Sequence, residues 1–147
     1  MFHVVDDNLI SGKNTAKIIN LFNEKSRHFS SAMDYIEYLT SSDYERPTAI
    51  FTDLMMFKLG GYEMIEAILE SYPDQRFVVI SGRPDIDHPF KNRACFYLKK
   101  PYYPRDIEKI ILKLKSCEQQ GTLPDTDCAF ECDCSAYGLK DWKCPHT

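Results

Sequence analysis

The sequence contains no apolar run long enough to cross a membrane, and it has no internal repeat or low-complexity segment. It also lacks the basic segment followed by a long apolar stretch that a secretory signal requires, because the strand-like run MFHVV begins at Met1. We therefore expect a protein of the cytoplasm with no membrane association.

An excess of basic charge is missing as well. The formal net charge is −4, and it comes from residues 117–147, which hold 2 basic and 6 acidic side chains. No predicted helix carries a basic stripe. Because binding to nucleic acid relies on lysine and arginine to neutralise phosphates, the sequence predicts no direct contact with DNA or RNA.

The composition that is present indicates one globular domain with an appendage. The 147 residues are 44% hydrophobic and 27% charged, which is the balance of a protein with a packed core. Helical periodicity stops after about residue 116, and Gly121 and Pro124 follow. We expect a domain over 1–116 and a cysteine-rich, acidic tail over 117–147.

Short β-branched or aromatic runs alternate with helical segments along the chain. This alternation predicts an α/β fold in which helices cover both faces of a parallel sheet. The expected strands are 2–5, 27–31, 48–51, 76–80 and 95–98, and the polar second strand is the weakest. Before the last strand, Pro84 and Pro89 remove backbone donors, so we expect a short or broken fourth helix there.

Apolar residues at helical spacing predict which helix faces pack against the sheet. The expected core stripes are Ile18, Leu21 and Phe22; Met33, Ile36 and Leu39; Ile65, Ile68 and Leu69; and Ile107, Ile110, Ile111 and Leu114. The last stripe belongs to the clearest helix, because Pro104 suits its first turn.

Four of the expected strands end in residues that can do chemistry. These residues are Asp6 and Asp7, Asp53, Ser81, and Lys99 with Lys100. The carboxyl ends of parallel strands share one edge of a sheet, so one cleft is expected to hold three carboxylates, a hydroxyl and an ammonium. Neighbouring carboxylates repel unless a cation intervenes, and oxygen ligands favour a hard ion such as Mg2+. A carboxylate beside that ion can accept a phosphoryl group. The ion and a lysine then neutralise the negative charge on the phosphoryl oxygens.

The same residues carry a family resemblance. The motifs VVDDN, FTDLMM followed by Gly61, VVISG and LKKP stand in the order typical of response regulator receiver domains, which residues 2–115 resemble. The resemblance implies a flavodoxin-like, doubly wound five-stranded sheet with strand order 2-1-3-4-5. It also implies that Asp53 is the phosphoacceptor, and that Asp6, Asp7, the Asp53 carboxylate and the backbone carbonyl of Met55 hold Mg2+.

The resemblance also implies roles for residues in or directly after the fourth and fifth strands. Lys100 would pair with the phosphoryl group, Lys99 would face the surface, and Ser81 would donate a hydrogen bond to a phosphoryl oxygen. Tyr97, three residues before Lys100, matches the aromatic switch position of the family. The plainer interpretation of Tyr97 is a strand aromatic that packs against a helix.

The implied function is a stand-alone, phosphorylation-controlled signalling switch of two-component systems. It would accept a phosphoryl group from a histidine kinase or phosphotransfer protein and then change its binding to a downstream partner. We expect no enzyme activity beyond its own phosphorylation and dephosphorylation. The alternative is a receiver-like binding module that no longer uses phosphorylation and whose tail is a metal-binding or redox element.

Several features depart from this family or from related chemistries. The usual proline four residues after the acceptor is Phe57, and the usual acidic residue before Gly61 is Gly60. Phosphatases with an aspartate nucleophile use a second aspartate, as an acid, at the position of Met55, so this class is disfavoured. A flavin carrier is disfavoured because no Gly/Thr-rich phosphate loop follows the first strand.

The tail concentrates the cysteines, Cys128, Cys132, Cys134 and Cys144, with His146 close behind. In a reducing compartment clustered thiols more often bind metal or do redox chemistry than form structural disulfides, and four sulfurs suffice for tetrahedral Zn2+. The paired C-x-x-C arrangement of well-defined zinc sites is absent. Zinc binding, disulfides and free thiols therefore all stay open.

Overall fold

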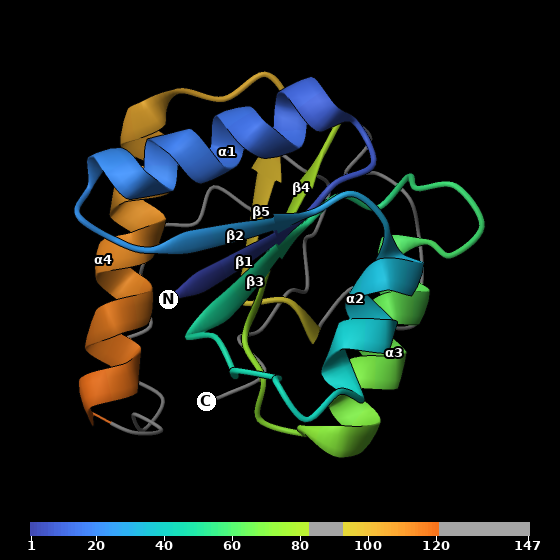
Figure 1. Ribbon diagram of the computed structural model, residues 1–147. Coiled ribbons are helices and arrows are strands. Elements are labelled where there is room, and N and C mark those ends of the chain that lie inside the picture. The colour runs from blue at the N-terminus through green and yellow to red at the C-terminus, as the bar shows by residue number, and fades with distance from the viewer. Residues whose placement is uncertain (83–92, 121–147) are drawn as a thin grey trace.

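A computed structural model describes residues 1–82 and 93–120 (Figure 1). The elements in chain order are β1 (Phe2–Val5), α1 (Leu9–Leu21), β2 (Ser26–Phe29), α2 (Ala32–Leu39), β3 (Ala49–Thr52), α3 (Gly61–Ser71), β4 (Phe77–Ser81), β5 (Phe96–Lys99) and α4 (Pro104–Gln120). All strand pairs are parallel, and the order is β2-β1-β3-β4-β5. The predicted fold class is confirmed, and strand bounds differ from the predicted ones by at most two residues.

Successive side chains of the strands face two separate core layers. Figure 1 shows α1 and α4 on one face of the sheet and α2 and α3 on the other. The layer under α2 and α3 includes Val5, Ile50, Val79 and Tyr97. The layer under α1 and α4 includes Val4, Phe51, Ile80 and Leu98. Since both faces are covered, these strands read as continuous apolar runs, as parallel strands do.

The position of β2 at the edge of the sheet explains why its sequence is polar and was the weakest strand prediction. Its burial follows the pattern intermediate, exposed, intermediate, buried, so only Phe29 lies fully in the core. Within residues 1–82 and 93–120, β2 pairs only with β1, so its polar residues can face solvent while the core stays apolar.

Two predicted core residues are wrong. Leu21 and Met33 are 74% and 52% exposed. Each residue advances about 100° around a helix, so a residue two positions from a buried one lies roughly on the opposite side. Leu21 stands two positions after buried Ile19, and Met33 stands two positions before buried Tyr35. The stripe that packs in α2 therefore starts at Ala32.

Some predictions fall outside the described residues. They are the short or broken helix around Pro84 and Pro89, and the tail cysteines with any zinc they hold. Helix α4 continues to Gln120, past the predicted boundary at 116. Within residues 1–82 and 93–120, no helix is both long enough and apolar enough to cross a bilayer. The cytoplasmic location stays a prediction.

Candidate functional site

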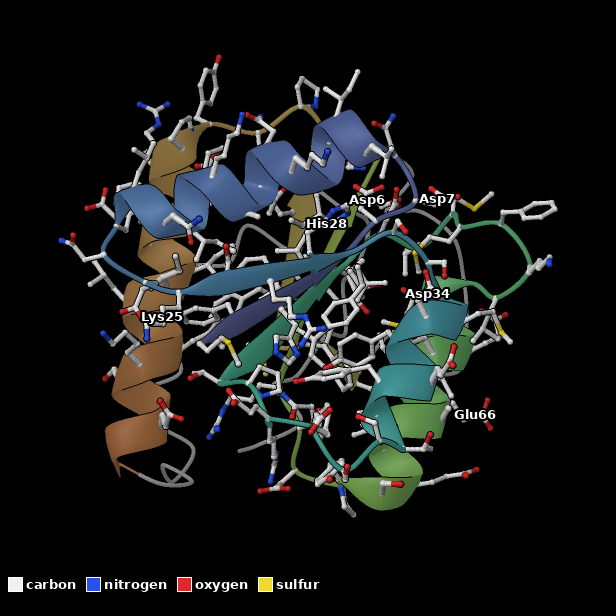
Figure 2. The ribbon with its side chains drawn as sticks, viewed as in Figure 1. Asp6, Asp7, Lys25, His28, Asp34 and Glu66 are labelled. Atoms are coloured by element: carbon white, nitrogen blue, oxygen red, sulfur yellow. The ribbon has the colours of Figure 1, made fainter. Side chains whose placement is uncertain are left out.

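The carboxyl edge of the sheet brings the three predicted carboxylates together. Val5 pairs with Thr52, so the residues that follow them leave the sheet side by side, and the Asp53 N–H donates to the Val5 carbonyl at 3.0 Å. One carboxylate oxygen each from Asp6, Asp7 and Asp53 lies within 4.8 Å of the other two. Figure 2 shows Asp6 and Asp7 at this edge, beside the start of α1.

Lys100 bridges two of these carboxylates. Its Nζ donates to Asp6 Oδ2 and to Asp53 Oδ2, each at 3.0 Å. Burial lowers the pKa of Lys100, but the hydrogen bonds and charges of the two aspartates outweigh burial and leave that pKa raised. The side chain is therefore an ammonium at neutral pH, placed to neutralise negative charge at Asp53.

Backbone groups fix the orientation of the Asp53 carboxylate. Oδ1 accepts from the N–H of Leu54 at 2.7 Å and from the N–H of Met55 at 3.3 Å, while Oδ2 accepts from Lys100. The Asp53 side chain is 12% exposed. It is thus held in one geometry and still open to a reactant at the sheet edge.

Asp7 is exposed, and its partner was not predicted from the sequence. Asp7 Oδ2 accepts from the backbone N–H of Phe57 at 3.0 Å. Every residue except proline carries such a donor, so the only sequence signal was that position 57 is not the family's usual proline.

The other predicted residues divide into two groups. Ser81 is buried at the end of β4, where its carbonyl accepts from the Lys100 N–H at 2.9 Å, and Lys99 faces solvent as predicted. Tyr97 is buried in the layer under α2 and α3, with its hydroxyl 3.3 Å from that of Tyr62. This packing matches the plainer interpretation of Tyr97, and its switch role stays a prediction.

Two glycines shape the loop between Asp53 and α3. A Cβ on Gly61 would lie 2.2 Å from the carbonyl oxygen of Asp53, so only glycine permits this close approach of helix and strand end. A Cβ on Gly60 would lie 2.5 Å from Glu63 Oε2. The carboxylate of Glu63 thus occupies the space into which the family's usual acidic side chain would extend from position 60.

The backbone of Asp6 is also held by His28 of β2. The ring Nε2–H donates to the Asp6 carbonyl at 2.9 Å, and Figure 2 shows His28 close to Asp6. The ring also lies against Gly12 of α1, where a Cβ would meet Nε2 at 2.1 Å. His28 therefore fills the space that Gly12 leaves open, and it fixes the backbone of the acid pair.

Replacing Gly12 by alanine is expected to destabilise the protein by about 1–2 kcal/mol, because the His28 ring must move and lose its hydrogen bond. In a His28→Ala background the clash is gone, and the same Gly12→Ala change is expected to stabilise by up to about 1 kcal/mol through helix propensity. Urea unfolding of the four proteins measures both effects. Equal effects of Gly12→Ala in the two backgrounds would contradict this contact.

The donor set fits a hard divalent cation. Three carboxylates converge, all ligand atoms are oxygens, and the single positive charge of Lys100 balances only part of their negative charge. Asp6, Asp7 and Asp53 are the residues that would hold Mg2+. The contribution predicted for the Met55 carbonyl stays a prediction.

Comparison with known proteins agrees with this geometry. A family model described as the response regulator receiver domain matches residues 2–112. A receiver domain protein from Clostridium thermocellum is 21% identical with a TM-score of 0.72, over 81% of this chain and 96% of that one. The N-terminal domain of a response regulator/sensory box/GGDEF 3-domain protein from Carboxydothermus hydrogenoformans is 18% identical with a TM-score of 0.69, over 81% and 97%.

A third similar structure is the BeF3-activated DrrB receiver domain, which is 18% identical with a TM-score of 0.63, over 77% of this chain and 96% of that one. These likenesses show a shared fold. No curated protein is similar enough in sequence to count as a match. With the family model spanning most of the chain and the five-stranded order confirmed, this chain belongs to the response regulator receiver domain family.

Proposed function

We propose that the protein is a phosphorylation-controlled signalling switch, which accepts a phosphoryl group on Asp53 with Mg2+ at the neighbouring carboxylates. The observation that carries the proposal is the position of Asp53, which lies within 4.8 Å of the acid pair and 3.0 Å from the Lys100 ammonium. A lone aspartate at a strand end is more often a helix cap or turn residue than a nucleophile, but Asp53 has carboxylates and an ammonium beside it, which are groups that phosphoryl transfer uses.

The transfer forms a bond between a carboxylate oxygen of Asp53 and the phosphorus of the donor. In a phosphohistidine donor the phosphorus–nitrogen bond breaks, and the ring nitrogen keeps the electron pair. The backbone N–H groups of Leu54 and Met55 keep the carboxylate in place for this attack. Bound Mg2+ supplies positive charge to the phosphoryl oxygens.

Lys100 supplies the second positive charge. In the described structure its ammonium already contacts the acceptor, so little rearrangement is needed as charge develops on the phosphoryl oxygens. Hydrolysis of the acyl phosphate returns Asp53 to its carboxylate. The protein would thus catalyse only its own phosphorylation and dephosphorylation, without a separate substrate.

The surface around the site suits a protein donor. Leu9 and Ile10 follow Asp7, and Met55 and Phe57 follow Asp53; all four side chains are at least half exposed. We call these four residues the apolar rim. A histidine kinase or phosphotransfer protein that brings a phosphohistidine to Asp53 would approach these side chains, and burial of their apolar area would favour binding.

Incubation with a small acyl phosphate and Mg2+ tests the proposal. We expect the intact mass to rise by one phosphoryl group, and we expect base treatment to remove it. Asp53→Asn should abolish the modification, whereas Asp34→Asn, on the exposed first turn of α2, should leave it unchanged. Wild-type protein that stays unmodified, or equal modification of Asp53→Asn, would overturn the proposal.

A further inference from the structure

The loop between β3 and α3 leaves the sheet at Asp53 and extends beyond the body of the domain before it returns at Gly61 (Figure 1). On this loop the side chain of Phe57 is 77% exposed. Its backbone, however, is tied to the site, because the Phe57 N–H donates to Asp7 Oδ2 at 3.0 Å. Three other side chains of this loop pack against the core, and the Phe57 N–H additionally anchors the loop on one of the three carboxylates.

An unusual turn directs this N–H. Lys58 has φ 68°, a left-handed conformation that is uncommon outside glycine and asparagine, and the Leu59 N–H donates across it to the Phe57 carbonyl at 2.9 Å. Such backbone is unfavourable unless surrounding contacts hold it. The bond between Phe57 and Asp7 is such a contact, immediately before the strained residue.

We propose that the backbone N–H of Phe57 positions the Asp7 carboxylate for a divalent ion. This hydrogen bond then couples ion binding at Asp7 to the conformation of the β3–α3 loop. The inference rests on the proposed function, because it takes Asp7 to be an ion ligand. An exposed aspartate samples several rotamers, and the N–H selects one of them. The carboxylate keeps its other lone pairs free for a cation, since two oxygens offer about four acceptor sites.

The coupling acts in both directions. If the N–H favours the carboxylate orientation that binds the ion, the bound ion favours the hydrogen bond by the same factor. Ion binding then fixes the loop and, with it, the position of Phe57 in the apolar rim. Proline at position 57 would have no N–H, so a receiver with the usual proline lacks this link.

Titration calorimetry with Mg2+ on wild type, Phe57→Pro and Phe57→Leu tests the link. Phe57→Pro removes the N–H, whereas Phe57→Leu keeps it and changes only the exposed side chain. Removal of an outer partner of a metal ligand typically costs about tenfold or more in affinity, so we expect about tenfold weaker binding for Phe57→Pro. Phe57→Leu should stay within about twofold of wild type.

A second measurement guards against a proline variant that does not fold. By reciprocity, saturating Mg2+ should slow hydrogen exchange of the Phe57 amide in wild type by about tenfold. The Asp34 amide, bonded to Ser31 Oγ at the start of α2, is the reference and should not respond. Equal Mg2+ affinities of the proline and leucine variants, or an unresponsive Phe57 amide, would overturn the inference. If wild type binds Mg2+ but the variants do not differ, only this inference fails. If wild type binds no Mg2+, the ion site of the proposed function fails as well.

Discussion

Lys100→Met is expected to destabilise the protein by about 2 kcal/mol at neutral pH and to tighten Mg2+ binding at least about fivefold. The Lys100 ammonium lies 3.0 Å from both Asp6 Oδ2 and Asp53 Oδ2, and its side chain is only 24% exposed. Removal of one partner of a buried pair leaves uncompensated charge, and partial exposure keeps the cost below the 3–5 kcal/mol of a fully buried pair. The same ammonium repels a cation at these carboxylates, by roughly 1 kcal/mol even in high dielectric.

The neighbouring lysine provides a matched control for this prediction. Lys99→Met removes the same charge one residue earlier, on an exposed side chain, and should change stability by no more than about 0.5 kcal/mol. Urea unfolding with and without Mg2+ measures the change in stability, and titration calorimetry measures the change in Mg2+ affinity. Added Mg2+ should reduce the stability deficit of Lys100→Met, because it neutralises the same carboxylates. Weaker Mg2+ binding in Lys100→Met would show that the lysine orients the aspartates more than it competes with the ion.

Strands that are covered on both faces were the most predictable part of the fold. The burial pattern of β1, β3 and β4 is buried at every position, so the sequence had to supply apolar runs there. Helix faces were harder, because several choices of stripe have helical spacing. In α1 the buried positions include Gly12 and Thr15, which a search for large apolar residues passes over.

The site was predictable at the level of side chains because parallel strands end at one edge. Asp6 and Asp53 had to meet once β1 and β3 were paired, and Lys100 had to follow β5 to the same edge. Backbone contacts were out of reach of sequence reasoning. The support of Asp7 by Phe57 and of Asp6 by His28 depends on where the chain passes, and the residue types alone do not reveal it.

A buried histidine is the largest feature of the core that sequence reasoning missed. His3 of β1 is fully buried, and its Nδ1 shares a hydrogen bond of 2.9 Å with the Tyr35 hydroxyl. The rings of Phe29, Tyr38 and Tyr44 pack around it at centroid distances of 5.5 to 6.4 Å. Its Nε2 finds no hydrogen-bond partner among the described residues, so this nitrogen has no acceptor that would stabilise a proton.

His3 is expected to cost the protein roughly 3 kcal/mol of stability between pH 7 and pH 4. Burial, the charge of Arg27 and the N-terminal ammonium lower the pKa of His3 from 6.5 to about 4. The unfolded chain therefore binds a proton below about pH 6.5, and the folded chain binds one only near pH 4. Because the unfolded state holds more protons in this window, stability falls as the pH falls through it.

The variant His3→Phe isolates this contribution, because phenylalanine fills the aromatic site and does not titrate. Urea unfolding should show its advantage over wild type growing as the pH falls from 7 to 4, to roughly 3 kcal/mol more than at neutral pH. Tyr35→Phe removes the hydroxyl partner but keeps the buried imidazole, so it should follow the wild-type pH dependence. If the difference between His3→Phe and wild type is the same at both ends of the window, protonation of His3 does not distinguish the folded from the unfolded state. Acid must then destabilise this fold through its other titratable groups.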